Sequence, residues 1–89
     1  ITLPDRLTSI ENDAFYACYS LTNITISNNI TSIEYNAFAF CRSLTTINFK
    51  GTKAEWKAIY KEDDWNEETG DYTVYCTDGK LDKYDNEID

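Results

Sequence analysis

A 23-residue repeat runs through the first half of the sequence, and this constrains the fold more than any other feature. Segment 7–26 matches segment 30–49 at eleven of twenty positions. The identical residues of the first segment are Thr8, Ser9, Ile10, Glu11, Ala14, Phe15, Cys18, Ser20, Leu21, Thr22 and Ile24. A period of this length is typical of repeat proteins in which each unit buries the apolar face of its neighbour. We therefore expect residues 1–49 to form two 23-residue units and a final strand.

Within each unit, alternating apolar and polar residues predict a strand with one buried face. Ile24, Thr25 and Ile26 alternate in this way, and the same positions recur at 1–3 and 47–49. Stacking the units predicts parallel strands centred near Thr2, Thr25 and Asn48. The outward side chains are small, polar and uncharged, which suits extended contact with a protein more than a deep pocket. The candidate binding residues are Thr2, Asn23, Thr25, Thr46 and Asn48.

The rest of each unit predicts an opposite wall and a turn-rich convex side. Segments 8–10 and 31–33 each turn one isoleucine inward. An Ala-Phe-x-x-Cys pattern follows at 14–18 and 37–41. We expect Phe15 and Phe38 to be buried in equivalent sites, and Cys18 and Cys41 to be buried, reduced and unreactive, because free cysteine behaves as a small apolar residue in a core. The exposure of Cys76 stays open.

The pattern L-T-S-I-E-x-x-A-F-x-x-C-x-S-L-T-x-I-x-I resembles the BspA-like class of leucine-rich repeats over residues 1–49. Its specific elements are the 23-residue period and the Ala-Phe and Cys positions. The resemblance implies a secreted or cell-surface protein of the kind found in host-associated bacteria, with a role in adhesion. It also implies that proteins, from the host or from bacterial surfaces, are the partners.

After Phe49 the repeat stops and a different unit begins. Thr52 and Glu55 have the spacing of a capping box, which predicts a helix to about Lys61. Its apolar face is formed by Trp56, Ile59 and Tyr60. A strand at 72–76, a turn at 78–79 and a return strand at 80–81 follow. These segments are similar to the C-terminal unit of the same family, so we expect residues 50–81 to be a capping unit and the acidic tail 82–89 to be frayed.

The predicted fold class is therefore α/β. We expect a fragment of a right-handed leucine-rich-repeat solenoid, with a short parallel sheet, a turn-rich convex side and a helix-plus-hairpin cap at the C-terminus. The N-terminal end exposes Leu3, Leu7, Ile10 and Phe15, and we expect it to cause self-association or lower stability than a chain extended upstream.

Charge and composition exclude several functions. The chain carries 16 acidic and 8 basic residues, a net charge of −8, with no cluster of lysine or arginine to bind phosphate. Nucleic acid is therefore not an expected partner. The apolar runs are too short for membrane insertion. Without histidine, Ser-His and Cys-His nucleophile pairs are impossible, and we expect no enzyme activity and no cofactor.

Several segments could be interpreted as catalytic, metal-binding, sugar-binding or glycosylation sites, but a structural role explains each of them better. The acidic residues between 62 and 71 offer pairs of carboxylates, but a solvated loop accounts for them, and they lack the order of a calcium loop. The three cysteines have no metal-ligand spacing. Trp56, Tyr60, Trp65 and Tyr72 could stack on sugars, although packing within the cap explains them. Sequons at Asn23 and Asn29 are interpreted as accidents of an Asn/Thr-rich repeat if the source is bacterial.

Two kinds of function remain. The first is a non-catalytic protein-recognition or adhesion module that binds through the concave face of the sheet. The second is a structural spacer that ends a longer array and presents other domains, with a carbohydrate-binding surface module as a further alternative.

Overall fold

Parallel strand pairs reproduce the 23-residue period in the computed structural model, which describes residues 1–88. Strand β2 (Asn23–Ile26) pairs with β4 (Thr46–Phe49), so that Ile24 lies opposite Ile47. Thr2 forms a parallel bridge to Thr25 on the other edge of β2. The parallel strands predicted near Thr2, Thr25 and Asn48 are thus confirmed, with the first reduced to a single bridge.

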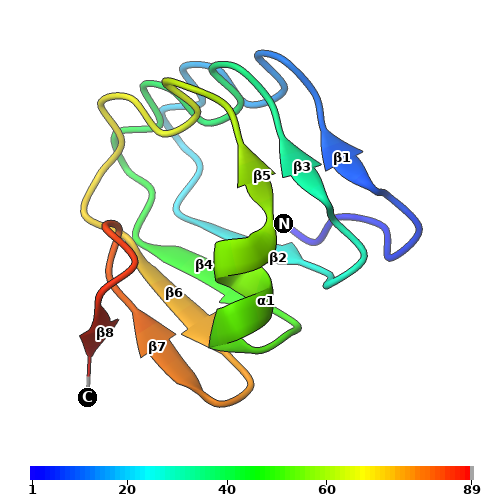
Figure 1. Cartoon of the computed structure of the whole chain (residues 1–89). Coiled ribbons are helices and arrows are strands. Elements are labelled where there is room, and N and C mark those ends of the chain that lie inside the picture. The colour runs from blue at the N-terminus through cyan, green and yellow to red at the C-terminus, as the bar shows by residue number, and fades with distance from the viewer. Residues whose placement is uncertain (89) are drawn as a thin grey trace.

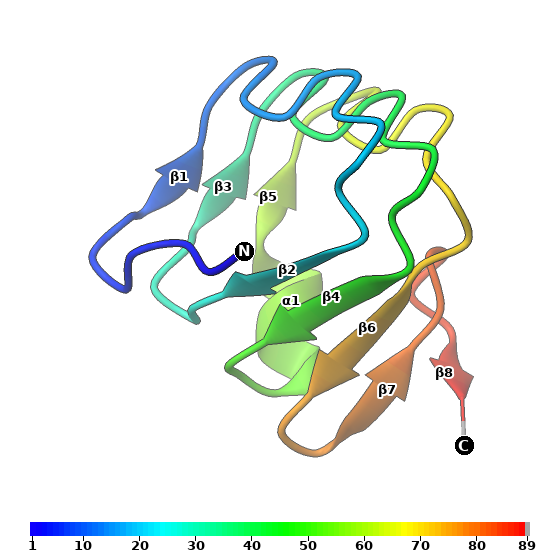
Figure 2. The same ribbon diagram turned by 180° about the vertical axis from the view of Figure 1, so that it is seen from behind.

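The strands form two sheets on either side of one apolar core (Figures 1 and 2). The three-stranded sheet has the order β1-β3-β5 and is entirely parallel, with strands at Ser9–Ile10, Ser32–Ile33 and Tyr60–Lys61. The five-stranded sheet has the order β2-β4-β6-β7-β8. Its last three strands are Thr73–Cys76, Gly79–Leu81 and Glu87–Ile88. Strand β6 is parallel to β4, whereas β7 and β8 continue the sheet antiparallel. Within residues 1–88 the regular elements are mostly strands, with one short helix, and the strands form one parallel and one mixed sheet.

Alternation buries one side chain each in β1, β3, β6 and β7 and two each in β2 and β4. Ile24, Ile33 and Ile47 have no exposed surface. Phe38 is also fully buried, but Phe15 is only half-buried, so its predicted burial is wrong. Their rings stack in parallel with centroids 5.2 Å apart. Phe38 packs between Phe15 and Trp65, whereas Phe15 has a covered face on one side only.

The convex side consists of turns, as predicted. Each turn segment contains two residues with positive φ, four positions apart: Asp13 and Ala17, then Asn36 and Phe40. A pair with the same spacing recurs at Asp64 and Glu68. The backbone amide of Phe15 donates to the carbonyl of Ala37, and the amide of Phe38 donates in the same way to the carbonyl of Trp65. Hydrogen-bonded stacking therefore continues beyond Phe49 into residues with little sequence similarity to the first two units.

Helix α1 (Lys53–Ala58) lies between β4 and β5. Its N-terminus has the predicted capping box, with both hydrogen bonds between Thr52 and Glu55 present. The helix is three residues shorter than predicted, because the chain becomes extended at Ile59 and residues 60–61 pair with β3. Tyr60 is consequently 64% exposed and does not belong to the apolar face expected of it. The Lys61 ammonium donates to the carbonyls of Trp56 and Ile59, which closes the helix C-terminus.

The C-terminal hairpin is present as predicted, but the tail differs. Val74 lies opposite Leu81, and Gly79 at the turn has a φ of 148° that other residues rarely adopt. The segment after β7 is not frayed: β8 pairs with β7, and Trp56 Nε1 donates to Asp85 Oδ1 at 3.1 Å. Asp89 of the predicted tail lies outside the described residues.

Candidate functional site

The strand register gathers the predicted binding residues on one surface, the outward face of the five-stranded sheet. In one cross-strand row, Asn23 lies opposite Thr46, and Thr46 opposite Thr73. A second row crosses the whole sheet at successive register positions, namely Thr2, Thr25, Asn48, Tyr75, Lys80 and Ile88. We call these nine residues the outer face. All five residues predicted from the sequence belong to it, and whether they bind a partner stays a prediction.

Sequence reasoning missed the C-terminal half of the outer face. Thr73 and Tyr75 belong to a strand that was predicted, but its parallel pairing with β4 was not. Residues 73–76 share no repeat motif with 46–49, so periodicity alone could not place them in the same sheet. The alternation of buried Val74 with partly exposed Thr73 and Tyr75 is the signal that would have found them.

The outer face is nearly uncharged on a chain of net charge −8. It presents hydroxyl groups, two amides, one phenol ring and one ammonium group, with no carboxylate among its nine residues. Thr2 and Asn23 are exposed, Thr25, Thr46 and Asn48 are half-buried, and Tyr75 is 43% exposed. Neutral side chains are cheaper to desolvate than ionised ones, and tyrosine is enriched in protein interfaces. The surface can therefore exclude water without burying a charge pair.

Two of the three cysteine thiols are made harder to ionise by burial, which raises their pKa. Cys41 is buried, and its Sγ donates to the carbonyl of Phe15 at 3.0 Å. Burial raises the pKa of the Cys41 thiol, and it also raises the pKa of Cys76, which is half-buried. Cys18 is half-buried too, so the prediction that it would be buried like Cys41 is wrong. It belongs to the first unit, whose outer side is less covered. All three thiols are free.

The acidic loop and the aromatic residues have mainly structural surroundings. Most of the acidic side chains between 62 and 71 are exposed, and Glu68 pairs with Arg42 at 3.7 Å. Within residues 1–88, no group of three or more Cys, Asp or Glu side chains is arranged to hold a metal ion. Trp65 contacts Trp56 and Tyr72, each with ring centroids 6.1 Å apart. Packing thus accounts for these three aromatics, whereas Tyr60 is exposed.

Comparison with known proteins identifies the repeat. A family model described as "BspA type Leucine rich repeat region (6 copies)" matches residues 1–62. The match includes both 23-residue units and extends through α1 and β5. No curated protein and no solved structure matches the chain. In the part of the chain that the structure describes, no helix is long and apolar enough to cross a membrane.

Proposed function

Because the chain belongs to the BspA-type leucine-rich repeat family, we propose that it is a non-catalytic protein-recognition module that binds its partner through the outer face. Repeats of this family generally serve protein interaction, and proteins that carry them are typically secreted or exposed on the cell surface. We place this chain in the same setting, as an adhesion module of an extracellular or cell-surface protein.

The observation that carries the proposal is the continuous neutral row across the sheet. From Thr2 to Tyr75 it contains four short or planar polar side chains and no charge. On a chain with a large excess of acids, such a strip is the surface that a protein can cover at the lowest cost in desolvation. Two cavities in the described part of the chain, one beside α1 and one beside β1, involve none of its residues, which favours flat contact over capture of a small molecule.

We further propose that the stacked units are turns of a right-handed solenoid and that residues 50–81 close it. The parallel pairing of β2 with β4, one repeat further along the chain, supports the first part. The antiparallel strand β7 supports the second, because it ends the parallel succession of β2, β4 and β6. The proposed capping unit begins with a divergent third unit, since β5 and β6 pair with β3 and β4. Residues 82–89 form the acidic end of the chain.

The proposal is tested with the double variant Thr25→Lys and Asn48→Lys. These adjacent positions lie in the centre of the outer face, so two lysines should weaken association with a protein partner by tenfold or more, of the order seen for interface residues. The thermal midpoint should fall modestly, because both positions are half-buried and the two lysines face each other across the β2–β4 pair, but the outward-pointing side chains leave the core intact. Binding is measured by surface plasmon resonance against a panel of host matrix proteins and bacterial surface proteins.

The matched control is Ser20→Lys with Ser43→Lys. These exposed serines also occupy equivalent positions in successive repeats, but they precede β2 and β4 and lie off the outer face. The control should bind like the parent chain. Equal affinity for both double variants, or no protein ligand in the panel, would favour the structural spacer instead. Selective binding to a glycan array would favour a carbohydrate-binding module using the exposed Tyr75 ring.

A further inference from the structure

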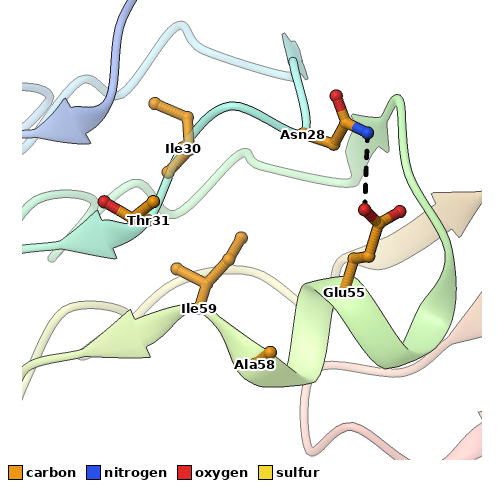
Figure 3. Close-up of a pocket in the computed structure, with 6 residues that line it drawn as sticks. All are labelled: Asn28, Ile30, Thr31, Glu55, Ala58 and Ile59. Atoms are coloured by element: carbon orange, nitrogen blue, oxygen red, sulfur yellow. Dashed lines mark hydrogen bonds between the residues drawn. The ribbon is translucent and has the colours of Figure 1, made fainter.

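A groove separates α1 from the connection between β2 and β3 (Figure 3). It has a volume of about 210 Å³ and is lined by Asn28, Ile30, Thr31, Glu55, Ala58 and Ile59. Between the first two units the corresponding connections touch, because Ser27 and Asn29 donate to the carbonyl of Asp5. Between the second unit and the residues that follow it, the connection from β4 to β5 contains α1 and is longer than the turn between β2 and β3. The groove lies between these two connections.

One end of the groove is polar and the floor is apolar. Ile30 and Ile59 are buried beneath it, and Ala58 lies at its rim (Figure 3). At the polar end Glu55 is held in place, since its carboxylate accepts from the Thr52 amide at 2.9 Å and from the Asn28 amide group at 3.5 Å. A carboxylate offers about four acceptor positions, so these two bonds leave capacity for a ligand.

The Glu55 carboxylate has no cationic side chain as an ion-pair partner within residues 1–88. Within residues 1–88, four ion pairs are formed, and none of them includes Glu55. A fixed carboxylate beside an apolar channel is complementary to a side chain with an aliphatic stem and a cationic head. The groove is smaller than small-molecule sites, which usually have volumes of roughly 300 Å³ or more. The volume of the groove therefore suits a single side chain.

We infer that this groove binds a lysine or arginine side chain of a basic partner protein. The stem lies over Ile30, Ala58 and Ile59, and the cationic head lies against the Glu55 carboxylate. The net charge of −8 would draw a basic partner toward this chain over a longer range. The groove shares no residue with the outer face, so this site and the proposed function can fail independently.

The experiment uses two probes that differ in charge but share an aliphatic stem. The ¹⁵N-labelled chain is titrated with Nα-acetyl-lysine methylamide and, separately, with Nα-acetyl-norleucine methylamide, while amide chemical shifts are followed. We expect the lysine probe to shift the amides of Thr31, Ala58 and Ile59 and to bind about fivefold more tightly than the norleucine probe, as an exposed ion pair would give.

Two variants with the same change in charge complete the test. Glu55→Gln removes the carboxylate but can keep the capping box, because glutamine serves at this position as well. It should lower the affinity for the lysine probe about fivefold, to the level of norleucine. Asp64→Asn, in the exposed acidic loop, should leave that affinity unchanged. Equal affinities for the two probes, equal losses in the two variants, or shifts confined to residues 62–71 would overturn the inference.

Discussion

Phe15 and Phe38 occupy the same position in successive units, yet they differ in how much of the ring is covered. Phe38 lies between two aromatic rings and has no exposed surface. Phe15 is stacked on one face and borders an apolar cavity of about 200 Å³ on the other. The repeat motif predicts that both residues turn inward. It could not predict the burial of Phe15, because in a stacked fold burial depends on the neighbouring unit as well as on the residue's own.

This difference predicts unequal costs of substitution. Phe38→Ala should lower the free energy of unfolding by about 3–5 kcal/mol, because it removes a buried ring and leaves a cavity. Phe15→Ala should cost markedly less, since the ring is already partly exposed to solvent. Urea unfolding followed by tryptophan fluorescence measures both, with Trp65 next to Phe38 as a reporter. Equal losses in the two variants would contradict this difference in burial.

At the scale of elements, the repeat predicted the parallel pairing of β2 with β4, but the partners of β5 and β6 were not predicted. The capping box at Thr52 predicted where α1 begins, since the signal lies within a single helical turn. The end of α1 was predicted too late, because the pairing of Tyr60 and Lys61 with β3 decides it and that partner lies more than one repeat earlier in the chain. For the same reason, Tyr75 was missing from the predicted binding surface. Local signals fix the start of an element, whereas long-range pairing fixes its end and its place in a sheet.

The acidic loop is attached to the start of β6 by a buried tyrosine, which gives a prediction for high pH. Tyr72 is 3% exposed, and its hydroxyl accepts a hydrogen bond from the Asn66 amide group at 2.9 Å. Burial raises the pKa of Tyr72 well above its ordinary value. In the unfolded chain the phenol loses its proton near pH 10. Its contribution to stability is therefore complete below about pH 10 and is lost as the pH rises further.

Other groups contribute to this alkaline range, so a variant is needed to isolate Tyr72. Burial raises the pKa of Cys41 and Cys76, so these thiols also make the free energy of unfolding fall as the pH rises. Burial lowers the pKa of Lys61, so this lysine makes the free energy of unfolding rise with pH. Between about pH 10 and 11.5, the free energy of unfolding should fall less with pH in the Tyr72→Phe variant than in the parent chain. Urea unfolding across that range measures it. Parallel pH profiles for the two proteins would show that Tyr72 does not carry the effect.

At the scale of the whole molecule, the two ends of the stack differ. At the C-terminal end, β7 and β8 extend the larger sheet, and Asp85 binds the indole of Trp56. At the N-terminal end, Leu3, Leu7 and Phe15 line the apolar cavity beside β1. Ile10 lines it too but is only 3% exposed, because its side chain points into the core, so its predicted exposure is wrong. An apolar surface next to an unpaired strand edge favours association between chains.

We therefore predict that residues 1–89, produced on their own, associate through the apolar surface beside β1. Sedimentation velocity over a concentration series should show a species that grows with concentration. Leu7→Asp should restore a monomer without unfolding the protein, because Leu7 is already 37% exposed. The control is Ile88→Asp, which changes an exposed apolar residue of β8 at the far edge of the five-stranded sheet and should not change association. A monomer throughout the series would show that this apolar surface does not drive association.

The nearest-neighbour pairing of the strands also has a kinetic consequence. Strands β3 and β4 have a parallel partner on each side. Within the described residues, β1 has a partner strand on one side, and the other side of β2 is paired through the single bridge from Thr2 to Thr25. Every pairing joins residues that are more than twenty positions apart, apart from the C-terminal hairpins, so no unit can form early on local contacts alone. Thermal opening then starts at the first unit and moves inward, and backbone amides of β4 exchange their hydrogens with solvent last.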